Sequence, residues 1–227
     1  MKKLFILLLF IATAATAQES KRSFSLSGFD KLDMGNAFII TVTQSNNYKI
    51  ETSGREQDLK DLVVKVSNGE LRIGYPSNWS GWKNRKEVYI NITMPKLVAV
   101  SFSGASKAKV SGFSSESFGI DLSGASSATF DIDAKNLALD CSGASSVAIV
   151  GDGQKLTADV SGASSLNAYD FKVSTATIDA SGSSGAKVYV TSRIVAEASG
   201  ASSVRYKGGA TSVVANTSGA GTVKSAN

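Results

Sequence analysis

Apolar and polar residues alternate along the second half of the chain, and one short phrase interrupts the alternation at regular intervals. Ser103-Gly104-Ala105-Ser106 returns six more times with small variations, and the glycines of successive copies are 20, 19, 19, 20, 18 and 19 residues apart. These glycines are Gly104, Gly124, Gly143, Gly162, Gly182, Gly200 and Gly219. A nearly constant period of this length predicts a repeat architecture in which each unit stacks on the next.

Within each repeat, the positions two and four residues before the glycine and four and six residues after it are mostly apolar. The positions between them are mostly polar. A period of two is typical of strands with one buried face, whereas Gly and Ser are typical of turns. Each repeat is therefore predicted to contain a strand, a tight turn, a second strand and a second, more variable turn.

Two arrangements of these strands fit the pattern. In a β-solenoid, equivalent strands of successive coils pair in parallel, whereas in an antiparallel meander successive strands pair through hairpins. Small residues recur in the same column of every repeat, and the inward positions include several short side chains: Ala158, Ala180, Ala186, Ala196 and Ala198. These features favour the solenoid, so the predicted fold class is all-β, a parallel β-helix with about 19–20 residues per coil.

Residues 23–95 have strand patterning without the clean repeat. Strands are expected at 37–43, 48–52, 63–66, 70–73 and 87–94, with a short helix at 55–62. Asn68-Gly69 between two of these strands is a strong hairpin signal. We expect residues 18–95 to form irregular first coils or a cap, and residues 96–227 to form the repeats of the same domain.

The N-terminus has the features of a secretory signal peptide at residues 1–17. Lys2 and Lys3 precede an apolar run, and Ala15-Thr16-Ala17 provides small residues for cleavage. The apolar run is too short for a membrane span. The protein is thus expected to be exported, to the periplasm, the outer cell surface or the medium, with no transmembrane segment in the mature chain.

Composition excludes several kinds of chemistry. Without Lys2 and Lys3, 22 basic side chains face 19 acidic ones, and their scatter argues against a nucleic-acid partner. The chain has no histidine, which removes Ser-His-Asp and Cys-His catalysis and histidine-ligated metals. Cys141 is the only cysteine and is expected to be a small buried residue rather than half of a disulfide. No catalytic residues and no cofactor are predicted, apart from calcium as considered next.

One acidic column stands out. Stacked coils would align Asp121, Asp140, Asp159, Asp179 and Glu197 on one outer face, where like charges repel. Three interpretations are open: a solvated face that discourages lateral association, a calcium site, or an acid–base pair for glycoside cleavage.

A second candidate surface lies at residues 75–86. This segment holds both tryptophans, and its candidate ligand-binding residues are Tyr75, Trp79, Trp82, Asn84 and Arg85. Aromatic side chains on such a loop stack on sugars or anchor a protein partner. The alternative is that they cover the first coil as a lid.

The last repeat has few bulky inward residues: Ala215, Thr217 and Ser225 occupy columns that hold mostly apolar residues in the other repeats. Because open strand edges recruit other chains, this end is expected to fray or to pack against a second copy, giving a homo-oligomer.

Several of these segments together resemble the GIN domain family of auto-transporter adhesin heads. The resemblance rests on the signal peptide, residues 38–42, the hairpin at 68–73, residues 92–97 and the Ser-Gly-Ala-Ser repeats. It implies a right-handed β-helix in an exported protein of a Bacteroidetes-type bacterium, and it implies no established activity.

The expected function is therefore that of an exported, non-catalytic, adhesin-like interaction module of the cell envelope, which binds a glycan or a protein. The alternatives are a polysaccharide-active enzyme on a β-helix scaffold and a calcium-binding structural protein of the envelope.

Overall fold

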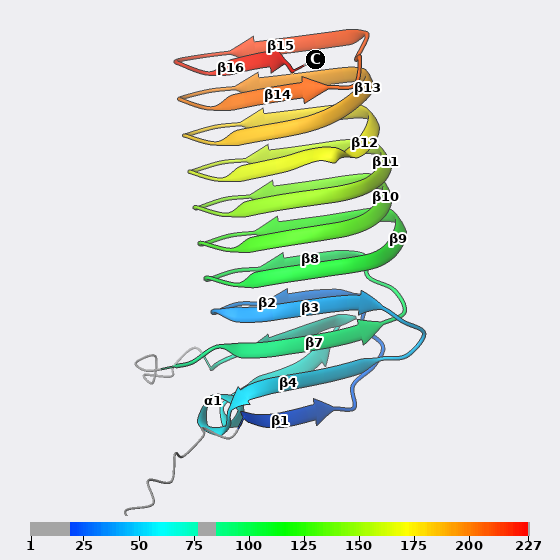
Figure 1. Ribbon diagram of the computed structural model, residues 1–227, viewed down its shortest axis with the longest axis vertical. Helices are drawn as coiled ribbons and strands as arrows, with labels where there is room; N and C mark the ends of the chain where they lie inside the picture. The colour runs from blue at the N-terminus through cyan, green and yellow to red at the C-terminus, as the bar shows by residue number, and fades with distance from the viewer. Residues whose placement is uncertain (1–18, 77–84, 227) are drawn as a thin grey trace, which may run out of the picture.

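The structure is a computed structural model that describes residues 19–76 and 85–226. These residues form a flattened solenoid of two facing layers of strands, stacked from the N-terminal end at the bottom to the C-terminus at the top (Figure 1). In the described part of the chain, no helix is long and apolar enough to cross a membrane.

Five long strands run through both layers and form the body of the stack. They are β9 (Lys107–Leu122), β10 (Ser127–Cys141), β11 (Ser146–Val160), β12 (Ser165–Ala180) and β13 (Gly185–Ala198). Their first halves lie in the layer that we call the front layer, with β1 (Glu19–Phe24), β4 (Lys49–Arg55), β7 (Val88–Met94), β3 (Phe38–Gln44), β14 (Ser203–Lys207) and β16 (Thr222–Ser225). Their second halves lie in the back layer, with β5 (Val63–Ser67), β6 (Glu70–Gly74), β2 (Lys31–Met34), β8 (Ala99–Phe102) and β15 (Ser212–Thr217).

Strand pairing is parallel throughout the repeats, which confirms the solenoid and excludes the meander. Leu139 of β10 pairs with Ile120 of β9 on one side and with Ala158 of β11 on the other. About seven turns of this kind extend from residue 99 to residue 225. The columns seen in the sequence are therefore real ladders of equivalent residues.

Each Ser-Gly-Ala-Ser phrase forms the same tight turn, and each turn rests directly on that of the preceding coil. The seven turn glycines have φ between +65° and +76°, a region that residues with a Cβ rarely adopt. The N–H of Ala144 donates a hydrogen bond to the carbonyl oxygen of Gly124 at 2.7 Å, and equivalent bonds link the other turns. A Cβ on Gly143 would lie only 2.4 Å from that same oxygen. Glycine is thus required both by conformation and by close approach.

The last serine of the phrase is buried in six successive turns, at Ser106, Ser126, Ser145, Ser164, Ser184 and Ser202. Hydroxyls of this column donate to backbone carbonyls, as Ser184 Oγ does to Val160 O at 2.7 Å and Ser202 Oγ to Ala180 O at 2.8 Å, while Ser164 Oγ accepts from Ser145 N at 3.3 Å. A buried hydroxyl with such a partner avoids the cost of an unsatisfied polar group. This explains why the repeat keeps serine at an inward position.

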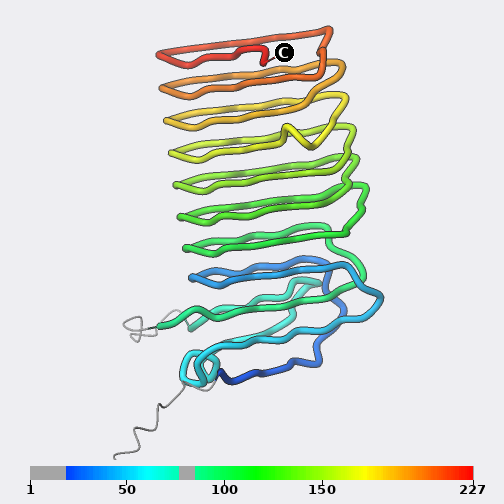
Figure 2. The backbone as a smooth tube through the Cα atoms, in the orientation of Figure 1, coloured from blue at the N-terminus to red at the C-terminus, as the bar shows by residue number. Residues whose placement is uncertain are grey.

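The second turn of each repeat differs from the prediction. In β9 to β13 the chain bends there without leaving the ladder, so that β10 pairs with β11 from Ser127 to Cys141. Parallel neighbours on both sides satisfy the backbone through the bend, which removes the need for a separate turn. A register shift between Ala168 and Lys172 marks a bulge in β12, where the backbone trace departs from the regular path (Figure 2). Only between β14 and β15, around Gly208-Gly209, does the strand break.

The hydrophobic core fills the space between the two layers. Apolar side chains alternate with exposed ones along every long strand, and the largest buried ones include Phe118, Phe130 and Phe171. Phe118 and Phe130 meet edge to face, with ring centroids 6.2 Å apart. Cys141 is also buried, as predicted, and burial raises the pKa of its thiol, which keeps it protonated and unreactive.

The elements expected in the N-terminal region are present. Helix α1 (Glu56–Lys60) follows β4, and β5 and β6 form an antiparallel hairpin through Asn68 and Gly69, both with positive φ. The spatial order, however, is not the order of the sequence. The coil made by β2 and β3 lies between the β6–β7 coil and the β8–β9 coil, because β2 pairs with β6 and β8 while β3 pairs with β7 and β9.

The tight turn directly below that of Gly104 was not recognised in the sequence, because it lacks the Ser-Gly-Ala-Ser phrase. Asn36, between β2 and β3, has a φ of +79° and takes the place of the turn glycine. Its carbonyl oxygen accepts the hydrogen bond of Ala105 N at 2.6 Å. Asparagine tolerates this left-handed conformation better than most residues, so it can begin the series that glycine continues.

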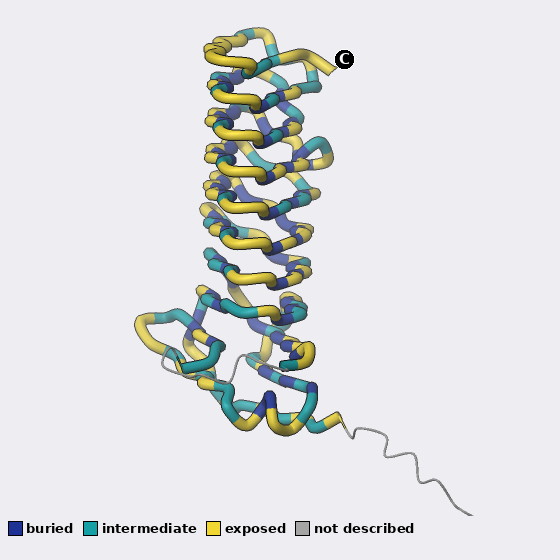
Figure 3. The backbone as a smooth tube through the Cα atoms, turned by 90° about the vertical axis from the view of Figure 1, so that its left-hand side faces the viewer, coloured by how far each residue is buried: buried dark blue, intermediate teal, exposed yellow. Residues whose placement is uncertain are grey.

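The two ends of the solenoid differ. At the N-terminal end, the antiparallel strands β1, β4 and β5 and helix α1, with its fully buried Leu59, cover the core. At the C-terminal end, β15 pairs only with β13 and β16 only with β14 among the described residues. The last coil is mostly exposed, and Val213 retains 42% of its accessible surface (Figure 3). Packing of this end against a second copy stays a prediction, which light scattering at high protein concentration would test.

We predict that Gly143→Ala lowers the free energy of unfolding by about 3 kcal/mol or more, because left-handed strain of about 1–2 kcal/mol adds to a backbone clash. Gly28→Ala is the control: Gly28 also has a positive φ of +77°, but a Cβ there meets nothing within 4 Å. Denaturant unfolding of both variants would measure the difference. Equal losses would show that the close stacking of the turns contributes nothing.

Candidate binding surfaces

The acidic residues of successive coils lie side by side in one column of the back layer, as the sequence predicts. Asp140 pairs with both Asp121 and Asp159, Asp179 pairs with both Asp159 and Glu197, and all five side chains are exposed. We call these five residues the acidic ladder. Parallel pairing in register places their backbones about 4.8 Å apart from one coil to the next.

Two carboxyl groups of the ladder, those of Asp121 and Asp159, have raised pKa values. Burial and the negative charges of Asp140 and Asp33 raise the pKa of Asp121, and burial and the charges of Asp140 and Asp179 raise the pKa of Asp159. Among the described residues, no lysine or arginine forms an ion pair with the five ladder carboxylates. The charged forms of Asp121 and Asp159 therefore cost folding free energy at neutral pH.

The ladder does not assemble a multidentate metal site. Residues 19–76 and 85–226 contain no group of three or more Asp, Glu or Cys side chains placed to hold one metal ion. A cation there would meet at most two ladder carboxylates, whereas calcium takes six to eight oxygen ligands. Calcium binding at Asp121, Asp140, Asp159, Asp179 and Glu197 stays a prediction.

A shallow depression of about 410 Å³ runs beside the lower part of the ladder. Small residues of successive coils, Ala99, Gly119 and Ala138, leave the depression open. Three carboxylates of the acidic ladder also line it: Asp121, Asp140 and Asp159. The arrangement suits a cationic or hydroxyl-bearing group better than an anion.

The second predicted surface is described only at its two ends. Trp79, Trp82 and Asn84 lie outside the described residues, while Tyr75 and Arg85 are described. The connection from β6 to β7 stands at the edge where later coils have their Ser-Gly-Ala-Ser turn, since these strands pair with β2 and β3. With β6 ending at Gly74 and β7 beginning at Val88, this connection has more residues than the four-residue turn of the later coils.

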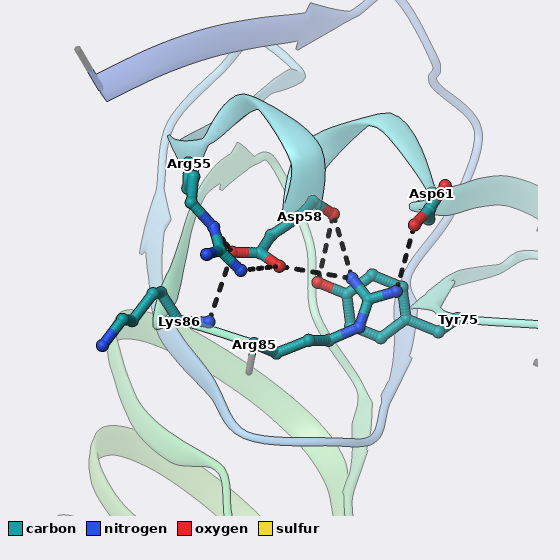
Figure 4. Close-up of polar contacts among 6 residues, drawn as sticks. All are labelled: Arg55, Asp58, Asp61, Tyr75, Arg85 and Lys86. Carbon is teal, nitrogen blue, oxygen red and sulfur yellow. Dashed lines mark hydrogen bonds and ion pairs between the residues drawn. The ribbon is translucent and has the colours of Figure 1, made fainter. Parts of the chain in front are cut away.

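Tyr75 and Arg85 pack against helix α1 around a buried carboxylate, Asp58 (Figure 4). The guanidinium carbon of Arg85 lies 3.4 Å from the ring centroid of Tyr75, and Arg85 Nη2 is 3.2 Å from Asp61 Oδ2. The Tyr75 hydroxyl donates to the carbonyl oxygen of Asp58 at 3.2 Å. These contacts fix the base of the loop to the N-terminal cap.

Asp58 is the centre of this cluster. Arg55 holds its carboxylate with two hydrogen bonds, of 2.9 and 3.1 Å, and the backbone N–H of Lys86 donates a third at 3.2 Å. Burial by itself would raise the pKa of Asp58, but these hydrogen bonds and the charges of Arg55 and Arg85 outweigh it and lower the pKa. The carboxylate stays ionised and ties three segments together.

Tyr75 and Arg85 therefore have a structural role at the loop's base. This role fits the interpretation of the segment as part of a lid over the first coils. Ligand binding by Tyr75, Trp79, Trp82, Asn84 and Arg85 stays a prediction, because one loop can both cover the core and bind.

A third surface was missed in the sequence analysis. In the upper coils, the outer face of the front layer gathers basic and aromatic side chains, among them Tyr169, Lys187, Tyr189, Arg205 and Lys207. A signal was present in the sequence: Lys109, Lys187, Arg205 and Lys224 each stand five residues after a turn glycine. Apolar columns dominated the alignment, so this outward column was overlooked.

The fold and these surfaces define a β-solenoid repeat protein with extended, charged outer faces. The family model described as "putative auto-transporter adhesin, head GIN domain" matches residues 28–210, so the chain belongs to this GIN domain family. This confirms the resemblance drawn from the sequence.

Solved structures share the whole fold at low sequence identity. A putative adhesin from Bacteroides fragilis superposes with a TM-score of 0.84 at 22% identity, covering 92% of this chain and 97% of that one. A putative adhesin from Parabacteroides merdae gives 0.70 at 15% identity, covering 93% and 98%. A protein from Parabacteroides distasonis described as a putative lipid binding protein gives 0.70 at 16%, also covering 93% and 98%. No curated protein matches the chain.

We predict that Asp58→Ala lowers the free energy of unfolding by about 3–5 kcal/mol, because it removes the buried carboxylate that accepts hydrogen bonds from Arg55 and from the backbone N–H of Lys86. Asp61→Ala, which removes a more exposed carboxylate, should cost less than about 1 kcal/mol. The lowered pKa means that the contribution of Asp58 is complete above its ordinary value of 3.8 and is lost as the pH falls through the folded-state pKa. Denaturant unfolding at pH 7 and at low pH measures both; a loss for Asp58→Ala no larger than that for Asp61→Ala would contradict the assignment.

The ladder generates a prediction of the opposite sign. Since the pKa of Asp159 is raised, its favourable contribution is complete below 3.8 and is lost as the pH rises through the folded-state pKa. Asp159→Asn should therefore stabilise the protein at pH 7 by about 0.5 kcal/mol, or about 1–2 °C in melting temperature, and much less at pH 3 or in 1 M salt. Asp131→Asn is the control, because Asp131 pairs with the uncharged Ser111 and Val150. An equal gain in both variants would refute repulsion along the ladder.

Proposed function

We propose that this protein is an exported, non-catalytic binding module of the bacterial cell envelope, of the adhesin type, whose ligand is a glycan or a protein. The observation that carries the proposal is the pair of flat outer faces, on which the same kinds of side chain recur from coil to coil. Repeat proteins of this construction commonly use such extended surfaces for binding.

Membership of the GIN domain family supports binding rather than catalysis, since the family is described by adhesion. The sequence adds a chemical argument. With no histidine in the chain, the many serines have no imidazole base, and the buried serines of the tight turns are explained by packing and by hydrogen bonds such as that of Ser126 Oγ to Ser123 O. The lone thiol is buried and protonated.

The location follows from the predicted signal peptide at residues 1–17, which lies outside the described residues, and from the family's adhesin character. An exported binding module acts in the periplasm, on the outer cell surface or in the medium. A rigid stack with a closed N-terminal end suits presentation of its faces to a large ligand.

The test is native affinity electrophoresis of residues 18–227 in gels that contain neutral or acidic polysaccharides, followed by an assay for newly formed sugar ends. We expect retardation by at least one polymer and no new sugar ends. Matched gels without polymer give the reference mobility. New sugar ends would overturn the proposal in favour of a polysaccharide-active enzyme, and failure to bind any glycan in these gels, together with failure to bind isolated envelope proteins, would refute the binding module.

A further inference from the structure

In the upper coils, basic and aromatic side chains gather on the outer face of the front layer. From β12 to β16, one column runs from Asn167 through Lys187 and Arg205 to Lys224, each paired with the next in parallel register. The neighbouring column holds Tyr189 paired with Lys207, and Tyr169 lies beside them. We call Tyr169, Lys187, Tyr189, Arg205 and Lys207 the basic–aromatic face.

The aromatic rings and the cations of this face are in contact. Lys207 Nζ lies 4.9 Å from the ring centroid of Tyr169 and 5.4 Å from that of Tyr189, and Lys187 Nζ lies 6.0 Å from the Tyr169 centroid. Cation–π contacts of this kind hold long side chains in defined positions while their N–H groups still point to solvent. The face is therefore partly pre-organised.

Positive charge on this face is not neutralised within the protein. Among the described residues, no carboxylate forms an ion pair with Lys187, Arg205, Lys207 or Lys224, whereas Lys135 pairs with Glu116 at 2.8 Å and Lys49 with Glu51 at 2.9 Å. The acidic ladder belongs to the opposite layer, beyond the core, about 10 Å away or more. Cations stacked on successive coils repel one another, and an anionic ligand would relieve that repulsion.

A depression of about 410 Å³ adjoins the cations. Its lining includes the hydroxyls of Ser165 and Ser203, the amide of Asn167, and the side chains of Lys187 and Arg205. Gly185 stands in the column of Ser165 and Ser203, and the absence of a side chain there opens the depression. Hydroxyl and amide groups beside a cation are suited to a sugar ring that carries an acidic substituent.

We propose that the basic–aromatic face and its depression bind an acidic polysaccharide, one that carries carboxylate or sulfate groups. Lys187, Arg205 and Lys224 occupy successive coils of one column, so they match the regularly spaced anions of a linear polymer that runs along the stack. Arg205 and the lysines pair with the anions, and the Tyr169 and Tyr189 rings pack against the sugar's apolar face. This inference rests on the proposed binding function and names its ligand class.

The experiment uses residues 18–227 and affinity electrophoresis in gels that contain alginate, chondroitin sulfate, or neutral dextran as a reference. We expect retardation by the acidic polymers, reduced at high salt. Lys187→Gln combined with Arg205→Gln should weaken binding at least tenfold. The control pair is Lys107→Gln with Lys109→Gln, which removes the same amount of charge from β9, several coils away; Lys109 stands in the column of Lys187 and Arg205, and Lys107 in that of Gly185. This pair should change binding less than threefold.

A second variant tests the depression without changing charge. Gly185→Leu is chosen to fill it, because φ at Gly185 is not positive and a Cβ there meets only Ser203 O, at 4.0 Å. We expect this variant to lose binding at least tenfold while its melting temperature stays within a few degrees of the wild type. Tyr189→Ala should weaken binding as well, through loss of the packing surface for the sugar.

Several outcomes would overturn this inference. If the Lys187/Arg205 double variant and the Lys107/Lys109 double variant lost the same amount of binding, the polymer would be held by diffuse attraction to positive charge and not by this face. Full binding by Gly185→Leu would exclude the depression. Equally tight binding of double-stranded DNA, or of vesicles of anionic lipid, would reject a sugar polymer as the ligand class. Retardation by neutral dextran alone, unaffected by these variants, would refute the inference while leaving the proposed binding module intact.

Discussion

The structure depends on one close contact: the backbone of each turn glycine lies against the carbonyl oxygen of the turn glycine below it. Between Gly143 and Gly124 there is no room for a side chain, and the hydrogen bond from Ala144 N to Gly124 O fixes the two turns in register. In a strand, a slip of one residue would exchange the inner and outer faces. The contact between turn glycines fixes the strand register once in every coil, at the same edge of the stack. It therefore decides which residues form the core and which form the outer columns.

The in-register stacking of the turns aligns apolar residues in the core and also aligns charged residues on the outer faces. The acidic ladder of the back layer and the cations of the front layer are both consequences of in-register stacking. Ladders of like charge reduce stability, and the continuous core between the layers offsets that cost. Among the described residues, the carboxylates of the back layer run from β9 to β13 and the stacked cations of the front layer from β13 to β16, so the two outer faces of the solenoid differ in charge.

The ends of the stack carry a second asymmetry. The N-terminal end is closed by antiparallel strands and helix α1, and the ionised Asp58 ties the helix to Arg55, Arg85 and the backbone of Lys86. That cluster also anchors Tyr75 and Arg85, the described residues on either side of the segment with the tryptophans. The C-terminal end exposes inward positions of its last coil, including Val213 and Ala215. The outer faces and the exposed C-terminal end are thus spatially separate.

The sequence by itself determined the period, the inward columns, the hairpin at Asn68-Gly69 and the alignment of Asp121 with its successors, because each of these is a local pattern or the repetition of one. Only the tertiary structure decided the place of the β2–β3 coil, the role of Asn36 as the first turn, and the partners of Tyr75 and Arg85. These features join segments far apart in the chain and leave no periodic trace. The basic–aromatic face was determined partly by the sequence and partly by the tertiary structure. Its cations follow the repeat and can be found in the sequence. The bulge in β12 and the contacts of Lys207 with two tyrosines arise only when the coils are stacked.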